Sequence, residues 1–571
     1  MKLKNNLFFI LILFLFHSCE EKKNENLILP KQKVNETLLK FHQDRFSEPK
    51  LIEVTKNVTT AFAYEYSNFS FIEGKDGVIV IDGGWYQDAS KSALEAYQKK
   101  TTKPIVAILY THLHTDHFGG AQVFADATDE KIEVIAPKGW RNWINYSISP
   151  MRDMVARRAL SQMGILLPEG EEGTVGAGIG KSPRMKGGTG LVVPTRTIAV
   201  KTEIEIAGVR LVLIPSPGDL TDNMMIWLPK EKVLFTGDVL GGTFPYIATV
   251  RFEIDRKPVD FIESIDRSLA LEPRKLVSGH GRVLFEDEIN EVLLSTRDVI
   301  QFMINQMDRL VNKGRTVDEI ISELKLPEKL AKHPDLQAHY HRLEWIIKQM
   351  FIKRAGFFNT ENDLVKLTNI EENKRFIALL GSEEKVLKHA RTAFNNKDYR
   401  WASSLASKVL SVSANNAEAL RIQNASFKAI AAITISAGER NYLLTKVKER
   451  VHKLDWNKIL LANKLQTMSK VPNAKLMSLL SAKFKAEDAA NTAMRIDFQI
   501  AKELFPYEIR NAILTDKMSE KKAAEVVLQL THKTLVSIYS GQMSWEEAYE
   551  SGTVTVLKGL VKAKIFFGLM E

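Results

Sequence analysis

One short stretch, residues 111–120, constrains the fold of this chain more than any other. It places three histidines and an aspartate within six positions: His112, His114, Asp116 and His117. An apolar run over residues 105–110 comes directly before it and predicts a buried strand. Three imidazoles and a carboxylate cannot all face one hydrophobic core, but on a tight turn after a strand they can converge on one point. Because imidazole nitrogens and carboxylate oxygens bind divalent metals such as zinc, the stretch favours a metal site over a solvated polar loop.

The order of these residues, H-x-H-x-D-H, resembles the signature of the metallo-β-lactamase superfamily. The resemblance implies a four-layered αββα sandwich that builds its metal site from the loops at several strand ends. It also implies two metal ions. His112 and His114 would bind the first ion, while Asp116 and His117 would bind the second.

Four more side chains follow apolar runs and match further positions of the superfamily. Asp82 would support the metal loop from behind, as metal ligands commonly require. Asp238 in Thr-Gly-Asp stands where a carboxylate bridges both metals, and His280 in Ser-Gly-His stands at the last histidine. The superfamily usually reads P-G-H-T-x-D-N where this chain reads P-G-D-L-T-D-N, so Asp219 occupies the place of a histidine, with Asp222 as the alternative ligand. A carboxylate still binds zinc, but it makes the metal shell more negative.

A carboxylate at position 219 points to the alkyl sulfatase branch of the superfamily, and five stretches of the chain resemble that branch. They are residues 67–74, the insertion-like residues 157–195, residues 354–359, residues 393–419, and the region from about residue 494. This resemblance implies that a helical dimerisation domain and a sterol-carrier-like C-terminal domain follow the catalytic domain.

The predicted domain order combines this resemblance with the pattern of each region. Apolar residues recur at helical spacing within residues 286–435, and strand-like alternation returns after residue 491. We predict an α/β fold with these parts: a signal peptide over 1–18, a tether over 19–45, a metallo-β-lactamase-like catalytic domain over 46–290 with an insertion at 140–198, an all-α dimerisation domain over 291–435, and a small α+β domain over 440–571.

The N-terminal residues predict export. Lys2 and Lys4 precede an apolar run over residues 7–16, which is too short to span a bilayer as a permanent helix. Cys19 is the only cysteine of the chain and follows a small residue after this run, which resembles a bacterial lipobox. We predict lipidation of Cys19 and an exported lipoprotein of the outer membrane, facing the periplasm or the cell surface. A free thiol in a membrane-anchor segment is the alternative.

The formal net charge of +10 does not indicate a nucleic-acid partner, because basic residues are interleaved with acidic ones along the chain. It supports at most a mild attraction for anionic substrates. Five side chains are candidates to hold an anionic head group: Arg157, Arg158, Lys181, Arg251 and Tyr340. His339 and His341 beside Tyr340 are predicted to line a surface or cleft, with a second metal site as the alternative.

The alkyl sulfatase resemblance implies a homodimeric hydrolase of alkyl or aryl sulfate esters with two zinc ions per subunit. Two such ions would lower the pKa of a bridging water to near 7, with Asp116 and Asp238 as catalytic residues. The substrate would be a small anionic ester with an apolar tail, cleaved at either its C–O or its S–O bond into alcohol and sulfate.

Two segments depart from the alkyl sulfatase pattern. Residues 162–164 and 240–245 lack the Tyr, Asn and His that the branch carries there. A metallo-hydrolase of another ester, a lactone or a phosphodiester therefore stays open. A lipid-binding surface lipoprotein with a structural metal site is a further alternative from a different class.

Overall fold

The computed structural model describes residues 27–139, 149–251, 256–518 and 523–571. The chain forms two compact units, one of residues 31–367 with 427–571, the other of residues 368–426 with the segment that ends at Pro30. The predicted signal peptide and Cys19 lie outside the described residues, so export and lipidation stay predictions. No helix in the described part of the chain is long and apolar enough to cross a membrane.

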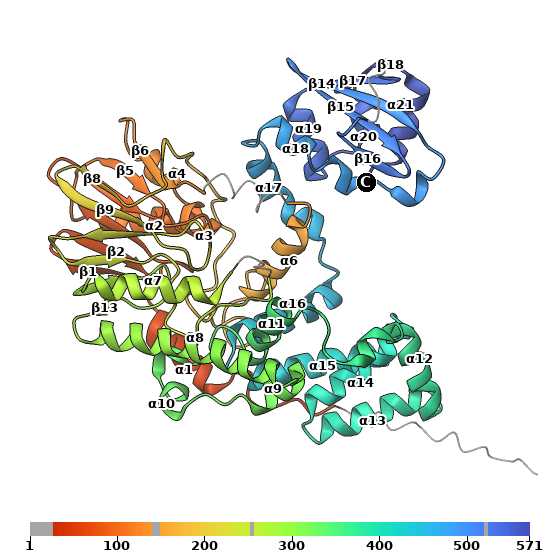
Figure 1. The fold of residues 1–571 in the computed structure, drawn as a ribbon, viewed down its shortest axis with the longest axis horizontal. Coiled ribbons are helices and arrows are strands. Elements are labelled where there is room, and N and C mark those ends of the chain that lie inside the picture. The colour runs from red at the N-terminus through yellow and green to blue at the C-terminus, as the bar shows by residue number, and fades with distance from the viewer. Residues whose placement is uncertain (1–26, 140–148, 252–255, 519–522) are drawn as a thin grey trace, which may run out of the picture. The chain divides into compact units, whose positions relative to one another are not determined.

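Two β-sheets form the N-terminal part of the larger unit (Figure 1). The first has the strand order β1-β2-β3-β4-β5-β6-β7, with β1 Lys50–Thr55, β2 Val58–Phe62, β3 Phe69–Glu73, β4 Val78–Ile81, β5 Ile105–Leu109, β6 Glu133–Pro137 and β7 Arg196–Ile198. The second has the order β13-β12-β11-β10-β9-β8, with β8 Thr202–Ile206, β9 Val209–Pro215, β10 Met224–Leu228, β11 Val233–Phe235, β12 Lys275–Val277 and β13 Leu284–Phe285. Strands β4 to β7 are parallel neighbours, which places the loops after β4 and β5 at one edge.

The two sheets pack face to face and helices cover their outer faces. Ile79 and Leu109 of the first sheet share a buried cluster with Leu213 and Ile226 of the second. The opposite face of the first sheet packs on helices α2 (Gln87–Tyr97) and α4 (Gln122–Ala125). The outer face of the second packs on α7 (Pro258–Ala270) and α8 (Glu288–Asn312), which run side by side in Figure 1. The central strands β4 and β5 are apolar runs because both of their faces are covered, whereas the edge strands β1 and β8 carry exposed polar residues. The predicted αββα sandwich is confirmed.

Helix α1 (Glu36–Phe46) lies inside the segment predicted as a tether, and that prediction is wrong from residue 36 onward. Asn35 caps the helix by accepting hydrogen bonds from the backbone of its first turn, and Leu38, Phe41 and Phe46 are buried. The polar composition around these three residues concealed their helical spacing.

The imidazole of His42 on α1 is buried, and its Nε2 accepts the Gly178 N–H at 3.2 Å. Burial, with a smaller contribution from His339, lowers the pKa of His42 to about 3. The unfolded chain binds this proton near pH 6.5. We therefore expect the folded state to lose stability as the pH falls from about 6.5 toward 3, by up to about 1.4 kcal/mol per pH unit from this group.

Urea unfolding of the wild type and of His42→Asn at several pH values measures this contribution. The variant should be less stable at pH 7 and should show a shallower loss of stability toward acid. Equal slopes in the two proteins would contradict the assignment.

The predicted insertion holds α6 (Arg152–Gln162) and then irregular backbone up to β7, with residues 140–148 outside the described part. The predicted helical region follows. Its helices are α8, α9 Val317–Glu323, α10 Glu328–Ala331, α11 Leu343–Ala355, α12 Asn369–Leu380, α13 Glu383–Asn395, α14 Tyr399–Val412 and α15 Ala417–Ile433. Two more helices, α16 Ala437–His452 and α17 Trp456–Met468, follow the predicted end at residue 435 and lie largely in the segment predicted as the α+β domain. Within the smaller unit, α13 and α14 pack through buried residues such as Phe394 and Leu405.

The C-terminal part is α+β, as predicted. Its sheet has the order β16-β15-β14-β17-β18, with β14 Met494–Ile500, β15 Glu503–Arg510, β16 Ile513–Thr515, β17 Val526–Leu530 and β18 Val554–Lys558. Helices α19 (His532–Ser540), α20 (Trp545–Glu550) and α21 (Leu560–Gly568) complete it. Phe498 and Trp545 each pack edge to face with Phe566 in its buried interior.

Candidate metal centre

The metal loop is a sharp turn between β5 and the short helix α3 (Thr115–Phe118). Two glycines after the helix allow the turn to pack closely. A Cβ atom at Gly119 would collide with the Trp85 carbonyl oxygen, and one at Gly120 would collide with the Ser90 side chain. The loop is therefore pressed against the residues that follow β4, and its imidazoles are directed to one side.

The first group of potential metal ligands consists of His112, His114, Asp219 and Asp238, all of them buried. One ligand atom from each lies within 4.8 Å of the others. His114 Nδ1 is 2.9 Å from Asp219 Oδ2, and His112 Nε2 is 3.5 Å from Asp238 Oδ2. The structure thus brings Asp219, and not Asp222, into this group.

The second group consists of Asp116, His117 and His280, also buried. Asp116 Oδ2 is 3.4 Å from His117 Nε2 and 3.2 Å from His280 Nε2. Asp238 adjoins this group as well, with Oδ1 at 3.3 Å from His117 Nε2 and Oδ2 at 3.2 Å from His280 Nε2. Asp238 therefore lies between the two groups, where a bridging ligand would have to be.

Neighbouring groups fix the orientation of two of the imidazoles. Asp82 accepts hydrogen bonds from the Thr111 amide at 2.7 Å and the Thr111 hydroxyl at 2.8 Å. Its Oδ2 is also 2.9 Å from His117 Nδ1, so Nε2 of His117 is left to face the cluster. His280 Nδ1 lies 3.0 Å from the Tyr66 carbonyl oxygen, which has the same effect on its ring.

The electrostatics of the cluster suit a cation. Burial alone would favour the neutral form of Asp238, but His280 and His117 hold the pKa of this carboxyl well below its usual range. Burial opposes charge on His280 too, yet Asp238 and Asp116 raise its pKa to about 9. The carboxylates therefore attract positive charge into a buried site that consists only of imidazole and carboxylate donors. This donor set fits zinc.

Three residues outside the predicted set hold the site together. Asn68 Nδ2 donates to the carbonyls of Ser278 and Gly281, both at 2.9 Å, and so fixes the loop of His280. Asn223 Nδ2 donates to the carbonyls of Ser216 and Thr236 and so ties the Asp219 loop to the Asp238 loop. Asn223 belongs to the P-G-D-L-T-D-N motif, which could have indicated its role.

Glu65 is the third such residue. Its buried carboxyl accepts the backbone N–H groups of Trp85 at 2.6 Å and Tyr86 at 3.1 Å. Burial raises the pKa of Glu65 to about 8. Glu65 thereby positions two aromatic residues that line the adjoining pocket.

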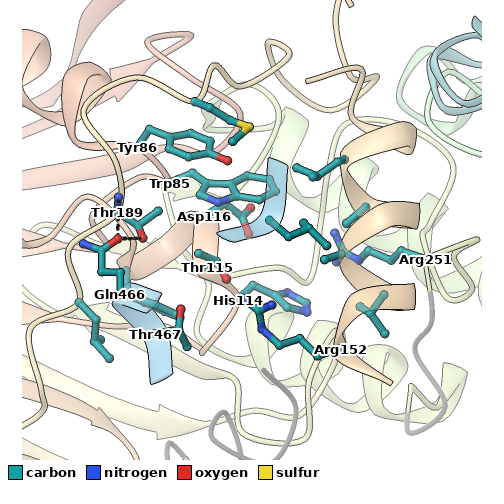
Figure 2. Close-up of a pocket in the computed structure, with 18 of the residues that line it drawn as sticks. Trp85, Tyr86, His114, Thr115, Asp116, Arg152, Thr189, Arg251, Gln466 and Thr467 are labelled. Carbon is teal, nitrogen blue, oxygen red and sulfur yellow. Dashed lines mark hydrogen bonds between the residues drawn. The ribbon is translucent and has the colours of Figure 1, made fainter. Parts of the chain in front are cut away.

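A pocket opens beside the cluster, and His114 and Asp116 form part of its wall (Figure 2). Figure 2 shows Arg152 and Arg251 on the same side of the pocket as His114. The remaining walls are largely apolar and come from the metal domain, α6 and α17: Trp85, Phe118, Val155, Ala159, Leu191 and Leu460. The pocket therefore combines two guanidinium groups near the candidate metal ligands with an apolar continuation.

Of the predicted head-group residues, Arg251 lines this pocket. Arg157 and Arg158 are exposed on α6, and Lys181 is half-buried in the insertion. None of these three residues lines the pocket. Tyr340 is buried, and its oxygen accepts hydrogen bonds from Gln162 Nε2 at 2.7 Å and Tyr66 at 2.9 Å.

His339 and His341 are buried and do not line the pocket beside the metal centre, so the prediction that they line a surface or cleft is wrong. His339 stacks on Phe41 with 4.0 Å between ring centroids, and His341 packs against Tyr340. Neither belongs to a potential metal-binding group among the described residues.

Comparison with known proteins agrees with this geometry. Residues 64–280 match the family model of the metallo-β-lactamase superfamily, residues 316–453 that of alkyl sulfatase dimerisation, and residues 462–571 that of the alkyl sulfatase C-terminal domain. Among curated proteins, a linear primary-alkylsulfatase of a Pseudomonas strain is 26% identical over 88% of this chain and 98% of its own length. An (R)-specific secondary-alkylsulfatase of Pseudomonas is 28% identical over 91% of this chain and 80% of its own.

The solved structure of the stereoselective inverting sec-alkylsulfatase Pisa1 from Pseudomonas superimposes with a TM-score of 0.82. It is 26% identical, and the match covers 94% of this chain and 87% of that one. The three-part architecture described above is therefore that of an alkylsulfatase structure.

Proposed function

We propose that this chain, in which a metallo-β-lactamase superfamily domain is joined to alkyl sulfatase dimerisation and C-terminal domains, is a hydrolase of alkyl sulfate esters with two zinc ions per subunit. The observation that carries the proposal is the position of the buried His and Asp groups at the wall of a pocket with guanidinium groups at one side and apolar walls beyond. A sulfate ester with an alkyl tail has the complementary shape and charge.

His112, His114, Asp219 and Asp238 would hold one ion, and Asp116, His117, His280 and Asp238 the other. When bound, zinc supplies Lewis acidity, which lowers the pKa of water to near 7 and offsets negative charge on the ester.

The chain's own residues account for binding and orientation. Arg152 and Arg251 offer charge-assisted hydrogen bonds to the sulfate oxygens. The apolar walls exclude water around the tail, and Asp82 and the Tyr66 carbonyl keep the His117 and His280 rings in a single orientation. Hydrolysis breaks either the C–O or the S–O bond of the ester and forms a new bond from the same carbon or sulfur atom to the oxygen of water. The products are an alcohol and sulfate.

A panel of substrates tests this function. Purified zinc-loaded protein is incubated with dodecyl sulfate, a nitrophenyl sulfate, a nitrophenyl phosphodiester and a lactone, and each product is quantified. We expect sulfate and dodecanol in equal amounts. Turnover of only the phosphodiester or the lactone would refute the proposal and favour the second candidate, a metallo-hydrolase of another ester, which the missing Tyr and His at residues 162–164 and 240–245 support.

The apolar pocket predicts a dependence on chain length. Each methylene that enters it gains about 0.8 kcal/mol, so kcat/KM should rise about fourfold per methylene from butyl to octyl sulfate. Leu460→Asn places an amide on the pocket wall and should lower kcat/KM for octyl sulfate on the order of tenfold. Butyl sulfate serves as the internal control, and an equal loss with both esters would contradict a role for Leu460 in holding the tail.

We also propose that the chain forms a homodimer through exposed apolar residues of the segment between α11 and α12. Phe357 is 79% and Val365 77% exposed there, within the region that matches the dimerisation model. Exposed apolar surface of this kind marks a protein interface. Phe357→Glu with Val365→Glu should produce a monomer by light scattering, while Val259→Glu, at an exposed position on α7, should leave the dimer intact. A dimeric double variant would exclude this surface as the interface.

A further inference from the structure

Arg256 lies against the metal centre without belonging to the predicted ligand set. Its side chain is 0% exposed, and its Nη2 forms an ion pair with Oδ1 of Asp219, which is 1% exposed. Its Nε donates to the Asp219 carbonyl at 3.3 Å, and its Nη1 donates to the Tyr246 carbonyl. The guanidinium is thus bound to both the side chain and the backbone of one candidate ligand.

The charge of the ligand set explains why a cation belongs at this place. Asp116, Asp219 and Asp238 are carboxylates, while the other candidate ligands are imidazoles, which bind a metal in their neutral form. A histidine at position 219 would leave two carboxylates instead of three. The guanidinium of Arg256 offsets the additional negative charge, because it contacts the carboxylate that replaces the histidine.

The two oxygens of Asp219 also face different partners. Oδ1 contacts Arg256, whereas Oδ2 lies 2.9 Å from His114 Nδ1, on the side of the metal group. Arg256 therefore holds one oxygen and leaves the other facing the candidate metal ligand His114, as outer partners of metal ligands commonly do.

We propose that Asp219 and Arg256 act as one electrically neutral unit that takes the place of a histidine ligand. The inference rests on the proposed metal centre and deepens it. Arg256 is a positioning residue: it orients Asp219 and balances its charge. A substitution of Asp219 alone or of Arg256 alone should therefore weaken zinc binding.

Restoring the histidine tests this dependence. In Asp219→His the buried guanidinium loses its carboxylate and stands beside a divalent cation and a neutral ligand. We expect the zinc affinity to fall about 10- to 100-fold, although the superfamily's usual ligand has been introduced. The double variant D219H/R256M removes the positive charge beside the metal group and should recover affinity to within about tenfold of the wild type.

The matched control is D219H/R256K, which keeps the positive charge and should stay as weak as D219H. D219H/R256Q repeats the rescue with a polar side chain in case methionine does not pack, and circular dichroism checks the fold of each variant. The readout is zinc affinity by competition with a chelator, together with zinc content by mass spectrometry.

The inference would be overturned if D219H binds zinc as tightly as the wild type does. It would also be overturned if neither D219H/R256M nor D219H/R256Q binds zinc more tightly than D219H. Rescue by R256K would overturn the charge argument. Because the readout is zinc binding, a wild type that binds zinc but leaves dodecyl sulfate intact would refute the proposed function alone.

Discussion

Asp238→Asn is expected to remove most of the hydrolytic activity, because this carboxylate adjoins both groups of candidate ligands. An amide carries no charge and provides a single oxygen ligand. Loss of the transition-state stabilisation that a metal provides, several kcal/mol, lowers kcat on the order of 10³-fold. Zinc content should fall from two ions toward none, while the far-UV circular dichroism stays that of the wild type.

Asp222→Asn is the matched control for this substitution. Asp222 belongs to the same motif as Asp219 but lies outside both ligand groups, so its variant should keep both metal content and kcat. An Asp238→Asn protein that retains two zinc ions, or an Asp222→Asn protein that loses them, would show that the ligands have been assigned to the wrong carboxylate.

Arg440→Met is expected to destabilise the larger unit strongly. The Arg440 side chain is buried on α16 and donates to the carbonyls of Gly173 at 3.1 Å, Lys33 at 2.6 Å and Ala431 at 2.8 Å, and to that of Glu171. Burial lowers the pKa of Arg440 to about 10, so it keeps its charge at neutral pH. Methionine leaves the carbonyls of Gly173 and Ala431 buried without this donor. Each such carbonyl lowers the free energy of unfolding by about 1–3 kcal/mol, or roughly 2–6 kcal/mol together.

Urea and thermal unfolding measure this loss, and Arg210→Met is the control. Arg210 pairs with Glu203 at the exposed surface, where solvent screening leaves such a pair with little effect on stability. If both variants unfold at similar denaturant concentrations, Arg440 does not join the insertion loop to α16 in the way described.

Much of the metal centre could be predicted from the sequence because its ligands stand at recognisable places. His112 to His117 are contiguous, and Asp219, Asp238 and His280 each follow a short apolar strand with a glycine beside them. Strand ends at one edge of a sandwich lie close together, so the positions of these residues along the sequence predict that their side chains meet.

The residues that support the ligands could not be predicted in the same way. Asn68 and Arg256 act on backbone carbonyls and a carboxylate that lie far away along the chain, and nothing local distinguishes them from surface residues. The positions of His339 and His341 were predicted wrongly for a different reason. A polar triplet of residues favours a surface or cleft, but these two rings are packed on Phe41 and Tyr340.

Anomalous scattering at the zinc edge, from crystals grown with zinc, tests the central arrangement most directly. Two peaks per chain are predicted, one among His112, His114, Asp219 and Asp238, the other among Asp116, His117, His280 and Asp238. A single peak, or peaks away from Asp238, would contradict a two-metal centre bridged by this carboxylate.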